Sequence, residues 1–233
     1  MLKISYDIND NGSKKLYVLL HGWGMNRRCY NRFTNLIHDS SIAFDLPGHG
    51  DSGDPYDYFD TYEYAYQIFL CLVRFVDREI VLVGHSFGGR LALLLSSVFK
   101  INVVGLILTS SAGINKFSIT KFIRVRIYKV CKWFVNKNVL SKKVLSNFGS
   151  DDYNNANVLL RRILVRVVNQ DLRVFLGYIK CRTLLVWDRR DKVTPYWICK
   201  KISRCIANSK IVLFARGGHF VFFCNESKVI DNI

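Results

Sequence analysis

The chain carries an apolar run and a glycine-flanked serine in the segment Ile80-Val81-Leu82-Val83-Gly84-His85-Ser86-Phe87-Gly88-Gly89. The apolar run predicts a buried strand, and helical spacing follows the second glycine. A G-x-S-x-G motif between a strand and a helix forms a sharp turn that lifts the serine hydroxyl clear of a sheet. We therefore expect Ser86 to be a nucleophile. The alternative is the glycine turn of a nucleotide-binding fold, but neither G-x-G-x-x-G nor a Walker lysine occurs here.

The same strand-then-helix alternation extends outward in both directions. Five further apolar runs are rich in Val, Ile and Leu, as strands buried on both faces are: Leu16–Leu20, Ser41–Leu46, Val103–Thr109, Thr183–Asp188 and Lys210–Phe214. Stretches with helical spacing lie between them: Thr61–Val76, Gly88–Val98 and Tyr196–Ile206. This pattern predicts the α/β class, with a doubly wound, mostly parallel sheet covered by helices on both faces.

Two regions depart from the alternation. An early strand, Lys3–Ile8, precedes the turn residues Asn11 and Gly12, which favour a hairpin, so we expect an antiparallel strand at the sheet edge. From about residue 115 to 180 helical patterns replace buried strands, notably Ile119–Val135 and Asn155–Val168, with a helix stop and N-cap at Phe148–Asp151. We interpret 1–233 as one domain whose helical cap insertion covers the carboxyl ends of the strands, where ligands bind.

A serine nucleophile needs a base, and the chain has five histidines. His219 follows the last predicted strand in Arg216-Gly217-Gly218-His219-Phe220, on the same side of the sheet as the serine turn. The chain order of serine, acid and then histidine is the order that this arrangement uses. We therefore predict His219 as the base. His38 lies in a surface-like stretch, and we expect the His85 side chain, next to the nucleophile, to point elsewhere.

The acid and the oxyanion donors come from two other loops. Asp188 ends the predicted strand before the last one, and Asp191 lies in the loop after it. We favour Asp191, because the acid must reach across to the histidine loop to hold its tautomer. The backbone N–H groups of Phe87 and Trp23 are the candidate oxyanion donors, since acyl transfer requires two such groups. The triad needs no metal and no organic cofactor.

The charge distribution and the cysteine content indicate possible partners and a cellular location. Residues 115–182 hold fifteen Lys and Arg against three Asp, which gives +12 of the net charge of +16. Such a block usually forms a solvated face, but it can also bind an acidic partner: an acidic protein (for example an acyl-carrier protein), a nucleic acid or an anionic membrane surface. No nucleic-acid motif accompanies it. Seven cysteines without a C-x-x-C pair predict buried, reduced thiols in a cytoplasmic protein. We see neither a signal peptide nor a transmembrane segment.

Five motifs in order make the chain resemble the α/β-hydrolase superfamily, in particular its small bacterial esterase-like members with a helical cap. They are Leu19–Gly24, Asp45–Ser52, Gly84–Gly89, Leu184–Pro195 and Gly218–Phe220. Within the superfamily the chain is similar to pimeloyl-acyl-carrier-protein methyl ester esterases and to meta-cleavage-product hydrolases. The resemblance implies an acid at Asp191, because the family usually carries glycine where Asp188 stands, and it implies a final helix shortened here.

These features together predict a serine hydrolase that cleaves a carboxylic ester through an acyl-enzyme intermediate. Hydrolysis of a carbon–carbon bond, of a thioester or of an acyl-carrier-protein methyl ester on the same triad is the alternative within catalysis. A non-catalytic binding protein of the same fold is the alternative outside it. The serine, the histidine and an acid are all present in the sequence, which favours the enzyme.

Overall fold

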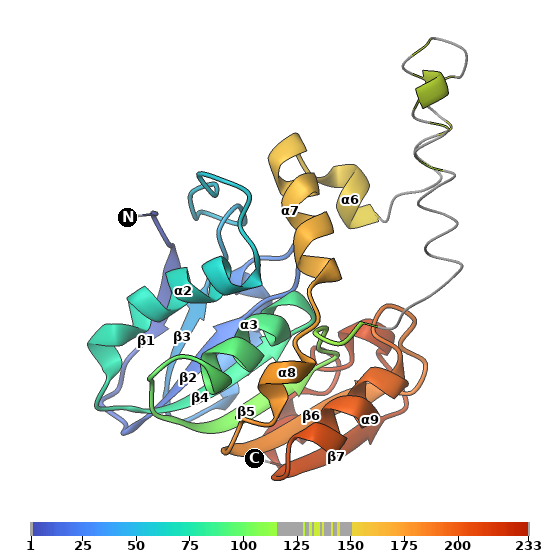
Figure 1. Cartoon of the computed structure of the whole chain (residues 1–233). Coiled ribbons are helices and arrows are strands. Elements are labelled where there is room, and N and C mark those ends of the chain that lie inside the picture. Colours follow the sequence, from blue (N-terminus) through green and yellow to red (C-terminus); the bar gives the residue numbers. More distant parts are fainter. Residues whose placement is uncertain are drawn as a thin grey trace.

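A computed structural model describes residues 2–115, 128, 131, 133–135, 137, 141, 144 and 151–232. Its centre is a seven-stranded sheet in the order β1-β3-β2-β4-β5-β6-β7 (Figure 1). The strands are β1 (Tyr6–Asn9), β2 (Lys15–Leu20), β3 (Ser40–Phe44), β4 (Glu79–His85), β5 (Val103–Thr109), β6 (Arg182–Asp188) and β7 (Ser209–Phe214). Strands β2 to β7 pair in parallel, which confirms the predicted sheet class.

The first strand lies antiparallel at the sheet edge, as expected, but its partner is different. β1 pairs with β3, with Tyr6 opposite Phe44, whereas the Asn-Gly turn suggested a hairpin with the next strand. That hairpin is wrong because β2 already has a parallel neighbour on each side, β3 and β4. Among the described strands, the edge left free near the amino terminus is the outer edge of β3.

Alternate side chains of β2 enter two different cores. Leu16, Val18 and Leu20 pack in the larger apolar cluster, together with the long helices α2 (Thr61–Leu72) and α3 (Phe87–Ser97). Tyr17 and Leu19 pack in a second cluster. Because successive strand residues point to opposite faces, both faces of the sheet are buried.

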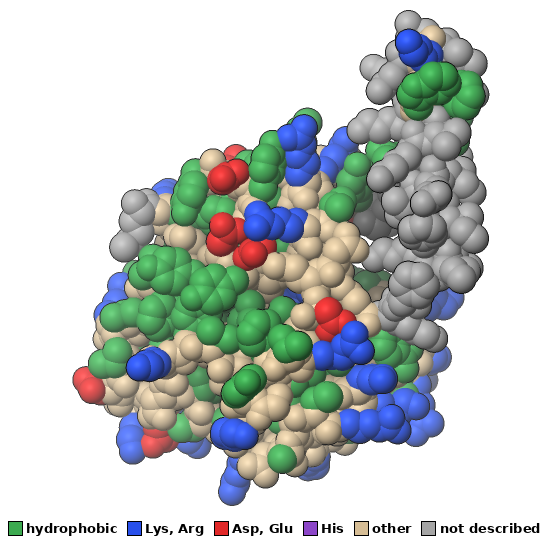
Figure 2. Space-filling view, in the orientation of Figure 1, with side chains coloured by type: hydrophobic (Ala, Val, Ile, Leu, Met, Phe, Trp, Pro, Cys, Tyr) green, Lys and Arg blue, Asp and Glu red, His purple; other side chains and the backbone are tan. Residues whose placement is uncertain are grey.

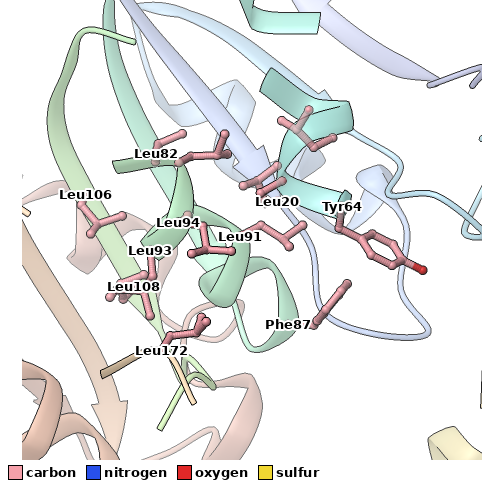
Figure 3. Packing of buried hydrophobic residues seen from close by; sticks show 14 of the residues in the cluster. Leu20, Tyr64, Leu82, Phe87, Leu91, Leu93, Leu94, Leu106, Leu108 and Leu172 are labelled. Carbon is pink, nitrogen blue, oxygen red and sulfur yellow. The ribbon is translucent and has the colours of Figure 1, made fainter. Parts of the chain in front are cut away.

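The two faces are covered by helices of different lengths. α2, α3, α8 (Arg173–Leu176) and α9 (Tyr196–Cys205) lie over one face (Figure 1). The second cluster includes Phe33 of α1 (Asn31–Leu36) and Val229 of α10 (Glu226–Ile230), so these two short helices serve the other face. Figure 3 shows strand leucines such as Leu82 and Leu108 packing against Leu91 and Leu94 of α3.

Helix α2 owes its start to a capping box. The Asp60 side chain accepts from the N–H groups of Tyr62 and Glu63, and the Glu63 side chain accepts from the N–H of Asp60. Both interactions satisfy backbone donors that the first helical turn leaves free. The helix then presents Tyr64, Ala65 and Ile68 to the core.

The insertion between β5 and β6 contains helices where the structure describes it. These are α6 (Asp151–Asn155), α7 (Val158–Asn169) and α8, so the predicted helix Asn155–Val168 corresponds to the end of α6 and most of α7. Most of the predicted helix Ile119–Val135, and residues 148–150 of the predicted stop signal, lie outside the described residues. Arg90 of α3 donates to the carbonyl oxygens of Gln170 (2.9 Å) and Val168 (3.4 Å), which ties the end of α7 to the sheet layer.

The outer surface of the helical layer has an apolar area and a basic area. Apolar side chains gather over α2, and Lys and Arg side chains gather over α9 (Figure 2). Tyr62 and Tyr66 are exposed on α2 and stack near Phe99. Lys200, Lys201 and Arg204 are the exposed basic residues of α9. Positive charge is therefore not confined to the cap segment.

The cysteines differ from the expectation of burial. All seven are free thiols, but only Cys199 is buried, and Cys205 and Cys224 are exposed. An apolar sequence neighbourhood was a poor guide there, because both exposed cysteines lie on the outward side of a helix end or turn. Among the helices of the described residues, none combines the length and the apolar character that a bilayer crossing demands.

Candidate active site

Ser86 lies at the junction of β4 and α3 in a backbone conformation that L-residues rarely adopt. Its φ is 49° and its ψ is −107°. The Ser86 N–H donates to the Thr109 carbonyl (3.1 Å), and its own carbonyl accepts from the N–H groups of Gly89 (3.2 Å) and Ala112 (3.1 Å). These bonds hold a strained turn that costs of order 1–3 kcal/mol. Strain of this kind, on a half-buried serine, is typical of a functional position.

The flanking glycines are required by close backbone contacts. A Cβ on Gly84 would lie 2.6 Å from the Gly88 carbonyl oxygen. A Cβ on Gly88 would overlap the Leu20 carbonyl oxygen at the end of β2. The turn is therefore tight within itself and pressed against the neighbouring strand, so the serine is held at the carboxyl edge of the sheet.

His219 and Asp191 come together from two other loops at this edge. β7 is followed by a 3-10 helix at Gly218–Phe220, which carries His219. The His219 Nδ1 lies 3.0 Å from Asp191 Oδ2, within hydrogen-bonding distance. The Asp191 side chain is fully buried, and 13% of the His219 side chain is exposed. A donor at Nδ1 leaves Nε2 as the basic nitrogen of the ring.

The Asp191 carboxylate is held by a dense set of donors. Oδ1 accepts from the N–H groups of Val193 (2.8 Å) and Thr194 (2.9 Å), and the Thr194 hydroxyl lies 2.8 Å from Oδ2. The buried Trp187 indole donates to the Thr194 carbonyl (2.8 Å), which fixes the loop to β6. Burial alone would raise the pKa of Asp191, but hydrogen bonds from His219 and Thr194 outweigh it and lower the pKa to about 2. The carboxylate is thus ionised at neutral pH.

Asp188 does not contact His219 through a hydrogen bond in the described structure. Its Oδ2 accepts from the Gly218 N–H (2.9 Å) and its Oδ1 from the Arg190 N–H (2.8 Å). Burial acts to raise the pKa of Asp188, yet these backbone donors and the Arg190 charge lower it below its usual value. Of the two candidate acids, the one beside the histidine ring is therefore Asp191.

The loop after β2 carries the predicted oxyanion donor and contacts the serine turn. The Trp23 and Phe87 rings meet edge to face at 5.2 Å, so the two predicted oxyanion residues are neighbours. His21 anchors this loop, since its Nε2 accepts from the Leu46 N–H (3.0 Å) and its Nδ1 donates to the Gly22 carbonyl (2.7 Å). Burial, assisted by nearby His49, lowers the pKa of His21 to about 3 and keeps the ring neutral.

His85 does not point away from the site, contrary to the sequence prediction. Its ring lies 5.0 Å from the His219 ring, centroid to centroid, and its Nδ1 donates to the Thr109 carbonyl (3.1 Å). A Cβ on Gly22 would lie 3.0 Å from the His85 ring, which therefore fills the space between the loop after β2 and His219. Burial, with a smaller effect of His219, lowers the pKa of His85 to about 3.

Asp45 is the first residue of the motif Asp45–Ser52, but the sequence alone indicated no role for it. Asp45 is fully buried after β3, where its carboxylate accepts from the N–H groups of Arg27 (2.7 Å) and Asp51 (2.7 Å) and pairs with the Arg27 guanidinium. It organises the loop that carries His49, whose ring lies 4.9 Å from the Trp23 ring. His38 is exposed on the surface. In the described part of the chain no cluster of His, Cys, Asp and Glu suits a metal ion.

Comparisons with known proteins agree with this architecture. A relative from Bacillus subtilis, the AB hydrolase superfamily protein YisY, is 25% identical over 95% of this chain and 91% of its own. The pimeloyl-[acyl-carrier protein] methyl ester esterase of Wigglesworthia glossinidia brevipalpis is 27% identical over 87% of this chain and 86% of its own. Among solved structures, an esterase from Exiguobacterium antarcticum superposes with a TM-score of 0.77, at 22% identity, over 99% of this chain and 94% of that one.

The family assignment rests on a match along almost the whole chain. The family model described as "Alpha/beta hydrolase family" matches residues 17–231. That range includes the strained serine turn, the loop of Asp191 and the loop of His219. The chain belongs to the alpha/beta hydrolase family.

Proposed function

We propose that this chain is a serine hydrolase that cleaves a carboxylic ester through an acyl-enzyme intermediate, with Ser86, His219 and Asp191 as its triad. The observation that carries the proposal is the 3.0 Å contact between His219 Nδ1 and the buried Asp191 carboxylate. It fixes the tautomer in which Nε2 is free to take a proton. The strained turn at Ser86, on the same edge of the sheet, supplies the nucleophile.

The chemistry follows from these groups. His219 Nε2 accepts the Ser86 hydroxyl proton while Oγ attacks the ester carbonyl carbon. The backbone N–H groups of Trp23 and Phe87 stabilise the oxyanion of the tetrahedral intermediate. The intermediate collapses to the acyl-enzyme as His219 gives its proton to the leaving alcohol. Water, activated by the same histidine, then releases the acid.

A screen of p-nitrophenyl esters with graded acyl length tests this proposal. We expect p-nitrophenol release with a burst, because acylation of the serine precedes slower hydrolysis of the acyl-enzyme. Ser86→Ala should abolish it. Ser97→Ala is the matched control, because that serine lies on the same helix and its hydroxyl donates to the Leu93 carbonyl (2.7 Å). Hydrolysis that survives in Ser86→Ala would contradict the proposal.

The relatives favour one more specific substrate. Two of them, from Wigglesworthia glossinidia brevipalpis and Neisseria meningitidis, carry the name pimeloyl-[acyl-carrier protein] methyl ester esterase. We propose a methyl ester on an acidic acyl carrier as the second candidate, with the basic segment of residues 115–182 as its docking surface. Hydrolysis of a thioester or of a carbon–carbon bond would use the same triad. Only the substrate that is turned over distinguishes these reactions from ester hydrolysis.

The described arginines of α7 are a poor choice for testing that surface. The Arg162 guanidinium hydrogen-bonds the Tyr58 hydroxyl and lies 5.2 Å from the centre of its ring. Arg166 bonds the Tyr58 carbonyl and lies 3.5 Å from Asp60. Reversing either charge would loosen α7 from the loop before α2, whatever the partner.

A charge reversal at two other basic positions of the segment tests the surface instead. We expect Lys142→Glu with Lys143→Glu to lower kcat/KM for a carrier-bound methyl ester and to leave p-nitrophenyl acetate turnover unchanged, with added salt acting in the same direction. The control is Lys200→Glu with Lys201→Glu, the same charge change on α9. If both pairs respond alike, the cap is not a docking surface.

The seven free thiols support a reducing location, and we propose the cytoplasm.

A further inference from the structure

A second buried carboxylate lies between the loops of the acid and the base. Asp188, at the end of β6, is 2% exposed. Its backbone carbonyl accepts from the Asp191 N–H (3.1 Å), and its Oδ1 accepts from the Arg190 N–H (2.8 Å). Its Oδ2 accepts from the Gly218 N–H (2.9 Å), on the loop after β7. One residue therefore contacts both loops, next to Asp191 on one and next to His219 on the other.

The base loop needs an external tie because two glycines precede the histidine. Gly217 has a φ of 124° and Gly218 a φ of 55°. Glycine reaches these values freely, but it also samples many others, so the loop has more conformational freedom than other residues would give it. A Cβ on Gly218 would meet nothing within 4 Å, so side-chain packing does not hold this position. The Gly218 N–H is held instead by its hydrogen bond to the Asp188 carboxylate.

The ionisation of Asp188 suits this role. Backbone N–H donors on both oxygens keep its pKa below the usual value in spite of burial. A charged acceptor makes a hydrogen bond roughly twice as strong as a neutral one. The Arg190 side chain, 70% exposed and 3.6 Å from Oδ1, adds a weak ion pair at the surface.

We propose that Asp188 is a positioning residue that fixes the spacing of the two loops and so aims His219 at Ser86, while Asp191 is the carboxylate that hydrogen-bonds the imidazole. The proposal rests on the proposed function, because it takes His219 as the base. It assigns a use to the other of the two candidate acids, which does not hydrogen-bond the histidine.

The first test compares two substitutions of Asp188. Asp188→Ala removes both acceptors and should lower kcat for p-nitrophenyl acetate by about 10²-fold with KM little changed, as expected when a reacting group is displaced by about 1 Å. Asp188→Asn keeps one acceptor oxygen, so its loss should be smaller. Arg190→Gln removes only the exposed ion pair and should match the wild type. Circular dichroism melting checks that each variant is folded at the assay temperature. If the alanine variant is not folded, the comparison uses Asp188→Asn and the wild type.

A double variant separates positioning from a general weakening of the fold. In a His219→Ala background the residual acylation rate depends on the oxyanion donors and on substrate binding. If Asp188 acts through His219, adding Asp188→Ala there should change that rate by less than about twofold, since coupled residues are not additive. If Asp188→Ala lowers kcat by the same factor in both backgrounds, or does not lower it in the wild type, the proposal is wrong.

Failure of the positioning role can be told from failure of the proposed function. Full hydrolysis by Ser86→Ala or by His219→Ala would overturn the triad itself. Loss of hydrolysis in those two variants, together with wild-type kcat in Asp188→Ala, would overturn only the role of Asp188.

Discussion

At the scale of single residues, two aspartates that lie three positions apart make different contacts in the site. Asp191 contacts the His219 imidazole at 3.0 Å, and Asp188 contacts backbone N–H groups of both loops. The sequence favoured Asp191 because its loop can reach the histidine loop, and in the structure the two loops meet at this residue. What the sequence lacked was any signal that the side chain of Asp188 would meet Gly218, thirty residues later.

Asp191→Asn should lower kcat by about 10⁴-fold, the order found for this change in serine protease triads. The amide can present its NH₂ to the imidazole and so favours the wrong tautomer. Steady-state hydrolysis of p-nitrophenyl acetate measures the loss. The control is Asp171→Asn, another carboxylate with a lowered pKa, which pairs with Arg173 outside the site. Equal activity of Asp191→Asn and the wild type would exclude Asp191 as the acid.

At the scale of elements, the strand-turn-helix unit of β4 and α3 is constrained mainly by its backbone. The run Ile80–Val83 and the glycines around Ser86 predicted this unit, because a buried strand and a tight turn both leave strong signals in the local sequence. The partner of β1 was not predictable in the same way. Pairing with β3 depends on which sheet edge is free, and an Asn-Gly turn carries no information about that.

Gly88→Ala should destabilise the fold by about 3 kcal/mol, because the new methyl group would overlap the carbonyl oxygen of Leu20 and the backbone cannot yield easily. Gly177→Ala is the matched control, since a Cβ there would meet nothing within 4 Å and its φ is −67°. The midpoint of urea unfolding compares the two variants with the wild type. An unchanged midpoint in Gly88→Ala would show that the turn is less tight than the structure indicates.

At the scale of the whole molecule, buried neutral histidines link stability to pH. The pKa values of His21 and His85 are about 3 in the fold, below the usual 6.5, because both rings are buried. The unfolded chain therefore binds protons below about pH 6.5 that the folded chain does not. This stabilisation is fully present above pH 6.5 and is lost as the pH falls toward 3.

The free energy of unfolding should accordingly decrease by about 1.4 kcal/mol per pH unit for each such histidine, between about pH 6 and pH 5. His85→Gln removes one of them and should flatten the slope by that amount. Urea titrations at several pH values give the slope directly. An equal slope in the variant and the wild type would mean that His85 is protonated in the folded protein.

The overall arrangement was more predictable than the charge distribution. Alternating buried strands and helices indicated the doubly wound sheet, since this pattern follows from local sequence. The partners of the cap charges were not predictable. Arg162 and Arg166 looked like part of a solvated or docking face, but their contacts with Tyr58 and Asp60 arise from the packing of α7 against a loop about one hundred residues earlier.

The central claim is that Ser86 is the nucleophile, and covalent labelling tests it most directly. The protein is treated with a fluorophosphonate, and intact mass followed by peptide mass spectrometry locates the adduct. We predict one phosphonyl group on Ser86, much slower labelling in His219→Ala, and none in Ser86→Ala, while Ser97→Ala labels like the wild type. Stoichiometric labelling of Ser86→Ala at another residue, or no labelling of the folded wild-type protein, would contradict the account.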